Sequence, residues 1–165
     1  MTKSHHTERL LPFSPRQLYD LVEDVQHYPE FIPWCVAARI RKREPNYQLA
    51  DLIIGFKLIK ETFSSHVRSD PDAMVIRSEA EKGPFKHLTN VWTFLPDPQG
   101  RPDYCLVQLA IEFEFANKVL QRLIETMFEE AQKRMVSAFE QRAHTLYGSS
   151  ANRAAVSPDA ASPTA

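Results

Sequence analysis

Residues 117–148 read NKVLQRLIETMFEEAQKRMVSAFEQRAHTLYG, and this stretch predicts one long helix from about Asn117 to about Leu146. The side-chain oxygen of Asn117 can accept a free backbone N–H of the first turn, and Gly148 suits a left-handed residue after the last turn. At 1.5 Å per residue the helix would span about 45 Å. Because propensity alone stabilises a lone helix little in water, its apolar side must pack against another apolar surface.

The apolar side chains of this helix recur every three or four residues, so they form one stripe. The stripe comprises Leu120, Leu123, Ile124, Met127, Phe128, Ala131, Met135, Ala138, Phe139 and Leu146. The opposite face carries Gln121, Arg122, Glu125, Glu129, Lys133, Gln141 and Arg142. The pattern therefore predicts that the first set is covered and the second faces water.

The surface for this stripe is encoded upstream, in segments whose side chains alternate between apolar and polar. The predicted strands are Ser4–Leu11, Val36–Arg43, Tyr47 to about Lys60, residues 61–67, Met74–Ala80, Leu88–Leu95 and Tyr104–Phe115. After the first strand, Ser14 and Pro15 form a helix start, with Ser14 as the N-cap and Pro15 at the first helical position. This short helix should end before Tyr28-Pro29, because a residue that precedes proline avoids helical dihedrals.

These elements predict an α+β fold, a curved antiparallel sheet of about six to seven strands wrapped on the long C-terminal helix. Hairpin-length connections make the strands antiparallel, and one apolar face per strand leaves the other face of the sheet wet. The whole of residues 1–148 then forms one domain. The composition of residues 149–165 is mostly Ala, Ser, Pro and Thr, which predicts a disordered tail.

Bulk composition excludes several classes of protein. The net charge of −1 gives no general attraction to nucleic acid, so we expect no DNA partner. No run of about 18 apolar residues exists to cross a membrane, and the polar N-terminus lacks a signal core, so we expect a cytoplasmic protein, or one peripheral to the inner membrane. Cys35 and Cys105 are expected to be free thiols. Four glycines without a G-x-G-x-x-G or Walker pattern argue against a phosphate loop.

A curved sheet on a single helix leaves a concave interior, where a ligand site would be an apolar space. Its large apolar side chains would suit a long apolar ligand with a weakly polar head, and they would equally suit a plain core. The segment Tyr28-Pro-Glu-Phe-Ile-Pro-Trp-Cys35 has the same two interpretations. It plugs one end of the core, or it forms the lip of a ligand cavity.

Glu61 is a charged residue predicted on an inward face. It is separated from Phe63 and Val67 by an even number of residues along the strand, so the three side chains share one face. An acid on an apolar face is costly unless it is paired or protonated. We therefore favour a bulge near Lys60 that turns Glu61 to solvent.

The residues that could carry catalysis are scattered: Asp24, His27, Cys35, Glu61, His66 and His87. A nucleophile could be drawn from Cys35 and His27, but no spacing fixes their geometry. The positions of Cys35, His66, His87 and Cys105 match no zinc pattern, and the pair His5-His6 is better explained as a polar strand start than as a metal site. We expect no enzyme, no metal and no cofactor.

A series of short motifs runs through the chain: Tyr28-Pro-Glu-Phe31 into Pro33-Trp-Cys35, Ala50-Asp-Leu52, Gly55-Phe56, Phe63-Ser-Ser65 before Val67, Gly83-Pro-Phe85, Leu88, Trp92-Thr-Phe94, Glu112 to Asn117, Met135 to Glu140, and Arg142-Ala143. In this order they resemble the coenzyme Q-binding members of the START-like superfamily, also called polyketide cyclase/dehydrase-like proteins, which have a helix-grip fold. The resemblance covers about residues 4–147.

This resemblance implies a non-enzymatic protein that binds ubiquinone or another prenylquinone in a hydrophobic tunnel and supports respiratory electron transport and quinone biosynthesis. Since the eukaryotic members carry transit peptides and this sequence has none, it resembles a bacterial member. The bacterial branch also contains ribosome-association toxins proposed to bind the large ribosomal subunit. That is the alternative function.

We expect the ligand to contact side chains from the strands and the long helix. The predicted lining is Leu52, Ile54, Phe63, Trp92, Phe94, Leu109, Ile111, Ile124, Met127 and Phe128, with Phe31, Trp34 and Phe85 at the mouth. A basic cluster formed by Arg39, Arg41, Lys42 and Arg43 is best explained as a solvated strand face. The alternative for this cluster is transient contact with anionic lipid headgroups at a membrane, or contact with ribosomal RNA.

Overall fold

Seven strands form one antiparallel sheet in the computed structural model, which describes residues 2–56 and 59–148. The strands are β1 (Lys3–Leu11), β2 (Cys35–Glu44), β3 (Tyr47–Phe56), β4 (Ile59–Asp70), β5 (Val75–Glu81), β6 (Phe85–Pro96) and β7 (Cys105–Phe115). Their order across the sheet is β1-β7-β6-β5-β4-β3-β2, so β1 and β2 are the two edges. The predicted α+β fold is confirmed, whereas the predicted tail at 149–165 lies outside the described residues.

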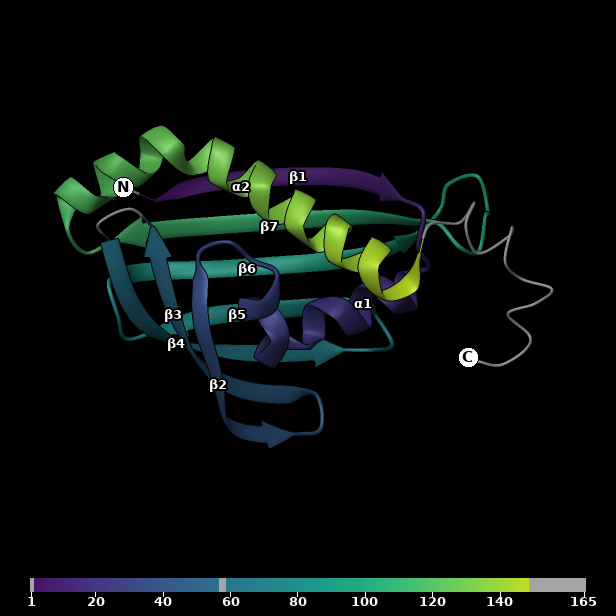
Figure 1. Cartoon of the computed structure of the whole chain (residues 1–165), viewed down its shortest axis with the longest axis horizontal. Coiled ribbons are helices and arrows are strands. Elements are labelled where there is room, and N and C mark those ends of the chain that lie inside the picture. Colours follow the sequence, from purple (N-terminus) through teal and green to yellow (C-terminus); the bar gives the residue numbers. More distant parts are fainter. Residues whose placement is uncertain (1, 57–58, 149–165) are drawn as a thin grey trace.

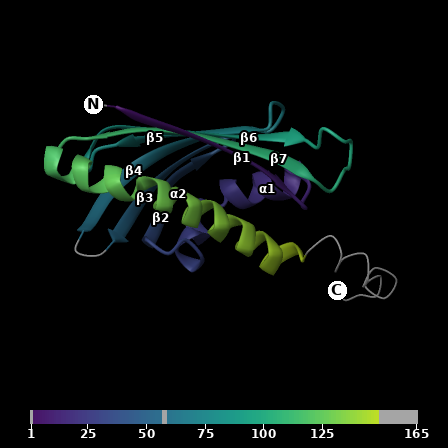
Figure 2. The same cartoon turned by 90° about the horizontal axis from the view of Figure 1, so that it is seen from above.

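The helices lie on one side of this sheet. The long helix α2 (Lys118–Tyr147) crosses the sheet diagonally, and the short α1 (Pro15–Glu23) and the 3-10 helix η1 (Val25–Glu30) share its side (Figure 1). Seen from above, both α1 and α2 lie below β6 and β7, and the other face of these strands stays uncovered (Figure 2). The sheet and its helices therefore enclose a concave interior.

The predicted helix caps are present. The Ser14 side chain accepts the Gln17 backbone N–H at 3.2 Å, and the Gln17 side chain accepts the Ser14 N–H at 3.0 Å. At α2, Oδ1 of Asn117 accepts the N–H groups of Val119 and Leu120 at 2.8 and 3.1 Å. The α1 helix ends at Glu23, which is before Tyr28-Pro29 as predicted. Tyr28 and Pro29 themselves lie within η1.

One face of α2 differs from the predicted stripe. Leu123 and Leu146 are 45% and 49% exposed, whereas Gln121, predicted to face water, is buried and its Oε1 accepts the Phe115 N–H at 2.6 Å. A straight 30-residue helix that crosses a curved sheet meets it at a different angle at each end, so a single stripe cannot stay in contact throughout. The buried side also includes Val136.

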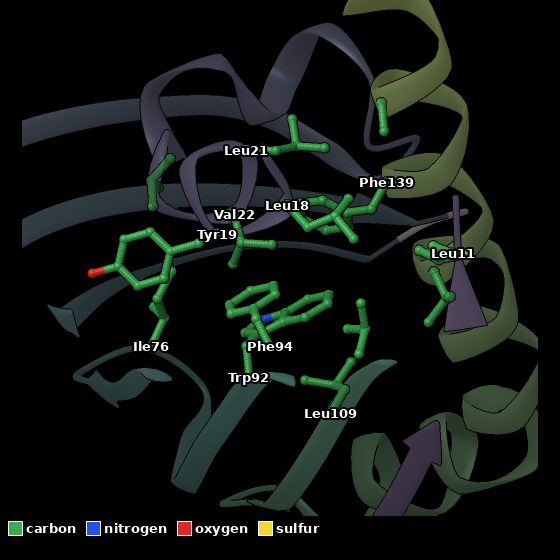
Figure 3. Packing of buried hydrophobic residues seen from close by; sticks show 14 of the residues in the cluster. Leu11, Leu18, Tyr19, Leu21, Val22, Ile76, Trp92, Phe94, Leu109 and Phe139 are labelled. Atoms are coloured by element: carbon green, nitrogen blue, oxygen red, sulfur yellow. The ribbon is translucent and has the colours of Figure 1, made fainter. Parts of the chain in front are cut away.

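The core between α1 and the sheet is the most tightly buried part of the chain. Figure 3 shows Leu18, Leu21 and Val22 of α1 facing Trp92, Phe94 and Leu109 of the sheet, with Phe139 of α2 beside them. The ring planes of Trp92 and Phe94 are parallel, with centroids 6.2 Å apart. This core closes one end of the concave interior.

Gly83 lies in the turn between β5 and β6, where the backbone passes close to β4. Its φ of 77° is left-handed, and a Cβ there would lie 2.6 Å from Cβ of Phe63 and 2.7 Å from the Thr62 carbonyl oxygen. Glycine is therefore needed both for the turn between β5 and β6 and for its close approach to β4.

We expect Gly83→Ala to lower the free energy of unfolding by about 1–3 kcal/mol, through backbone strain and the clash with Phe63. The control is Gly100→Ala, because Gly100 has a similar φ of 82° with nothing within 4 Å of a built Cβ. Urea unfolding of both variants checks this. Equal losses would show that the contact with Phe63 contributes nothing.

Candidate ligand cavity

The concave interior contains a cavity of about 270 Å³ beneath α2. Its walls come from η1, from all strands except β1 and β5, and from the first two-thirds of α2. The lining residues are Tyr28, Ile32, Trp34, Cys35, Leu52, Ile54, Gly55, Ile59, Glu61, Phe63, Phe85, Leu88, Asn90, Trp92, Ile111, Phe113, Phe115, Leu120, Ile124, Met127, Phe128, Ala131, Gln132, Met135 and Phe139. This volume is just below the range of about 300–1,000 Å³ that is typical of small-molecule pockets.

Most residues predicted to line a ligand site meet at this cavity. Those that line it are Leu52, Ile54, Phe63, Phe85, Trp92, Ile111, Ile124, Met127 and Phe128, together with Trp34. They come from the four strands β3, β4, β6 and β7, from α2 and from the segment before β2, and the strand alternation and the helical stripe had placed them on the same side. Whether they contact a ligand stays a prediction.

Phe94 and Leu109, although included in the predicted lining, do not line this cavity. They face a separate small pocket beneath α1, with Leu18 and Val22. Alternation gives the face of the sheet on which a side chain lies, but it does not give which helix covers that position. Trp92 borders both spaces and forms part of the wall between them.

Phe31 is the third predicted site residue outside the cavity. Its ring packs edge-on against Phe139 at 5.1 Å and Tyr28 at 5.8 Å, and it borders a groove on the outer side of α2. The adjacent Ile32 and Trp34 do line the cavity. In this segment Phe31 packs against the core and Trp34 forms part of the cavity wall, whereas its role as the lip of a ligand cavity stays a prediction.

Aromatic rings form one continuous wall. Phe63 meets Phe85 at 5.1 Å, Phe85 meets Phe115 at 4.7 Å, and Phe113 stacks on Phe128 at 4.5 Å. Sequence reasoning omitted Phe113, Phe115 and Leu88 from the site, although each shares the parity of a residue it did include. This row of rings offers a smooth apolar surface to a ligand.

Glu61 lines the cavity, and the predicted bulge at Lys60 is absent from the described pairing of β3 with β4. The register there is unbroken from Tyr47↔Arg68 to Phe56↔Ile59, so Glu61 lies opposite Ile54 and on the same face as Phe63. Within the described part of the chain, the Glu61 carboxylate has no hydrogen bond or ion pair. Its half-burial explains how an acid is tolerated there, because its end can still reach water.

Two amide side chains also line the cavity, so its polar groups are more numerous than the sequence suggested. Asn90 projects from β6, and its Oδ1 accepts a hydrogen bond from the Ser78 hydroxyl at 2.7 Å. Gln132 projects from α2, and its amide nitrogen donates to Oγ1 of Thr7 on β1. Both were visible in the sequence as polar residues at inward positions.

Burial increases along the cavity from the β3–β4 end towards the core. Ile54, Ile59 and Phe85 are half-buried, whereas Trp92 and Phe139 are 6% and 5% exposed. The open side therefore lies near Ile59 and Phe85, and the closed end lies near Trp92.

The candidate nucleophile is not assembled. Burial raises the pKa of the Cys35 thiol to about 11, and its Sγ lies 3.8 Å from the Ala37 carbonyl oxygen. His27 instead pairs with Asp24, whose Oδ2 is 2.7 Å from Nδ1. Both cysteines are free and buried, as expected.

The other titratable candidates lie outside the cavity. His66 contacts Tyr47 and Glu81, and His87 lies 3.4 Å from Glu112. His5 packs on Phe128 while the adjacent His6 is exposed on the opposite face of β1. Across residues 2–56 and 59–148, no three His, Cys, Asp or Glu side chains gather as a metal site would require.

The raised pKa of Cys35 has a consequence for stability. A thiol that ionises at 9.0 when unfolded and at about 11 when folded stabilises the fold below pH 9, and this contribution is lost as pH rises towards 11. We therefore expect the urea midpoint to fall over this interval. The fall should be smaller in Cys35→Ala than in the parent protein, and identical profiles would contradict the assignment.

The basic cluster on β2 is exposed and partly paired. Arg41 bridges to Asp51 at 2.9 Å, Lys42 to Glu44 at 3.1 Å, and Arg43 donates to the Gln26 side chain at 3.3 Å. Arg39 is also exposed. No helix in the described ranges is both long and apolar enough to cross a bilayer.

The sequence and the fold have counterparts among known proteins. A family model described as "Polyketide cyclase / dehydrase and lipid transport" matches residues 11–140. The chain belongs to this START-like family. The resemblance found in its sequence motifs is thereby confirmed at the level of the family.

Two relatives carry different names at almost the same similarity. The coenzyme Q-binding protein COQ10 homolog B, mitochondrial, of Xenopus laevis is 36% identical over 140 residues, which are 85% of this chain and 57% of the frog protein. The ribosome association toxin RatA of Rickettsia prowazekii is 35% identical over 146 residues, 87% of this chain and 97% of that protein. Overall identity therefore does not choose between the two names.

Solved structures agree on the fold. The Zhui aromatase/cyclase from Streptomyces sp. R1128 superimposes with a TM-score of 0.78 at 15% identity, over 87% of this chain and 94% of the cyclase. An 18 kDa protein from Caulobacter crescentus is 31% identical with a TM-score of 0.68, over 89% of this chain and 99% of that protein. The first likeness concerns the fold alone, and the START-like fold includes cyclases.

Proposed function

We propose that the protein binds a prenylated quinone such as ubiquinone in the cavity beneath α2, and carries or protects it without changing it chemically. The observation that carries this proposal is an apolar cavity with a few polar groups, in a chain 36% identical to a coenzyme Q-binding protein. A quinone has the matching chemistry, because it joins a ring with two polar oxygens to a long apolar tail.

The burial gradient suggests how such a ligand lies. Its ring would occupy the closed end near Trp92, where Asn90 and Gln132 supply polar groups. Its tail would run past Phe63 and Phe85 to the open side. Each Å² of tail surface removed from water contributes about 25 cal/mol, so the aromatic wall accounts for most of the affinity.

The side chains around the cavity favour binding over catalysis. Its one cysteine, Cys35, has a raised pKa and holds its proton at neutral pH, and His27 is engaged with Asp24. A thiol in that state is a poor nucleophile. The proposal therefore assigns no bond-making step to this protein.

The direct test is solvent extraction of the freshly purified protein, followed by mass spectrometry of the extract. We expect one prenylquinone per protein molecule, and its mass gives the tail length. An empty extract from folded protein that also fails to take up added ubiquinone would contradict the proposal.

A second candidate function is ribosome association, which the exposed cations of β2 favour. Arg39, Arg41 and Arg43 project from an edge strand, where a large anionic partner can approach without obstruction. Cationic side chains on such an edge suit the phosphates of RNA.

Replacing Arg39, Arg41 and Arg43 by Gln should abolish co-sedimentation with large ribosomal subunits if this second function holds, since each contact to phosphate depends on charge. The measurement is sucrose-gradient sedimentation at low salt, with the cavity variant Leu52→Lys as a control that keeps the surface charges. Unchanged sedimentation of the triple variant would remove this stretch from the interface.

A further inference from the structure

The two amides in the cavity flank the same short stretch of β7. Asn90 is paired with Ile111 across the β6–β7 ladder, and Thr7, the partner of Gln132, is paired with Leu109 across the β1–β7 ladder. Asn90 and Gln132 therefore approach the same part of the cavity from opposite sides. Glu61 is remote from the two amides. Val67 of β4 is paired with Ser78, which is paired with Asn90, and Glu61 lies six residues away from Val67 along β4.

Each amide is oriented by a hydroxyl on a neighbouring strand. Because the Ser78 hydroxyl donates to Oδ1 of Asn90, the NH₂ group of Asn90 is left without a partner among the described residues. Because the NH₂ group of Gln132 donates to Oγ1 of Thr7, its carbonyl oxygen is the unpartnered atom in the same part of the chain. Neither atom is sealed inside the protein, and both residues line the cavity.

The cavity thus presents one hydrogen-bond donor and one acceptor at its closed end. A quinone oxygen only accepts, so it pairs with Asn90 and leaves the Gln132 carbonyl desolvated and unpaired, which is costly. A phenolic hydroxyl both accepts and donates, so it can pair with the two amides together. The donor and the acceptor in the cavity therefore match the form of the ring that carries a hydroxyl.

Resting on the proposed function, we propose that Asn90 and Gln132 form a head-group subsite that selects a phenolic ring, such as the quinol, over the oxidised quinone. The quinol is expected to bind at least about tenfold more tightly. By the thermodynamic cycle that links binding to reduction, a tenfold preference raises the two-electron potential of the bound couple by about 30 mV. The protein would then hold its cargo in the reduced state.

The test measures the dissociation constants of decylubiquinone and decylubiquinol, the latter under argon, from quenching of tryptophan fluorescence, because Trp34 and Trp92 both line the cavity. In the parent protein we expect the tenfold preference. Gln132→Leu should abolish it while quinone binding is kept, because the acceptor that the quinone leaves unpaired is removed. Asn90→Leu should weaken both forms.

Thr7→Val is an independent variant on the edge strand β1, and it keeps both amides. Without the Thr7 hydroxyl, the Gln132 side chain can turn its NH₂ group into the cavity, so affinity for the quinone should rise. The matched control for Gln132→Leu is Gln108→Leu, which makes the same Gln-to-Leu change on the outer face of β7, where Gln108 donates to Glu8. This control should leave both affinities unchanged.

The outcomes separate the two proposals. Equal affinities for quinone and quinol in the parent protein would overturn the head-group subsite and leave quinone binding intact. A preference for quinol that survives both Gln132→Leu and Thr7→Val would overturn the assignment to these amides. Binding of neither form by the folded parent protein would overturn the proposed function itself.

Discussion

Leu52→Lys is expected to weaken quinone binding by about 100-fold or more while the protein still folds cooperatively. Leu52 lies on β3, opposite Phe63, and its half-buried side chain lines the cavity. A lysine there would carry its charge into the space that the tail must fill, and desolvating an unpaired ammonium group is strongly unfavourable. Retention of decylubiquinone, followed by fluorescence titration, measures the effect.

The neighbouring residue supplies the control for Leu52→Lys. Ile53 follows Leu52 directly on β3, is paired with Ala37 and Thr62, and does not line the cavity. Ile53→Lys places the same charge on the opposite face of β3 and should leave the dissociation constant unchanged. Equal losses in the two variants would mean that charge on this strand, rather than the cavity, governs binding.

Trp92→Ala is expected to lower the free energy of unfolding by about 3–5 kcal/mol, among the largest effects of any single truncation in this chain. Trp92 is 6% exposed, stacks with Phe94 and meets Phe139 edge-on at 5.0 Å. Its removal opens the wall between the ligand cavity and the small pocket beneath α1. Urea unfolding, followed by circular dichroism, gives the loss.

The joined space gives this variant a second signature. An apolar ligand that fills the enlarged cavity should restore part of the lost stability, because ligand binding to the folded state shifts unfolding by mass action. Trp34→Ala is the control, since Trp34 is half-buried at the cavity wall and should cost only about 1–2 kcal/mol. A loss at Trp92 no larger than the loss at Trp34 would contradict its place in the core.

The fold followed from local patterns because each pattern has a single structural meaning here. The alternation in β7 could only be a strand with one covered face, and the cap residues Ser14 and Asn117 begin helices where their side chains bond. These patterns do not show which helix covers a given residue of the sheet. Phe94 and Leu109 have the correct parity, yet they belong beneath α1 because α2 crosses the sheet diagonally.

The polar residues of the site were harder to assign for a different reason. Glu61 was expected to avoid an apolar interior, but hydrogen bonding along β3 and β4 keeps the register unbroken and carries the acid inward. Gln121 was assigned to water because glutamine is usually exposed, whereas its side chain satisfies the Phe115 N–H next to the helix start. In both cases backbone hydrogen bonds outweigh the preference of one side chain.

The pairing of the first strand with the last has a consequence for the order of folding. Lys3 is paired with Phe113, so β1 has no partner in the sheet until more than a hundred further residues have been synthesised. Contacts so distant in sequence make folding slow, because a long loop must close before they form. The newly made β1 therefore stays without its strand partner until β7 has been made, and the cavity closes only when α2 has followed the strands. If the protein binds a quinone as proposed, the ligand can be enclosed only after α2 has been made.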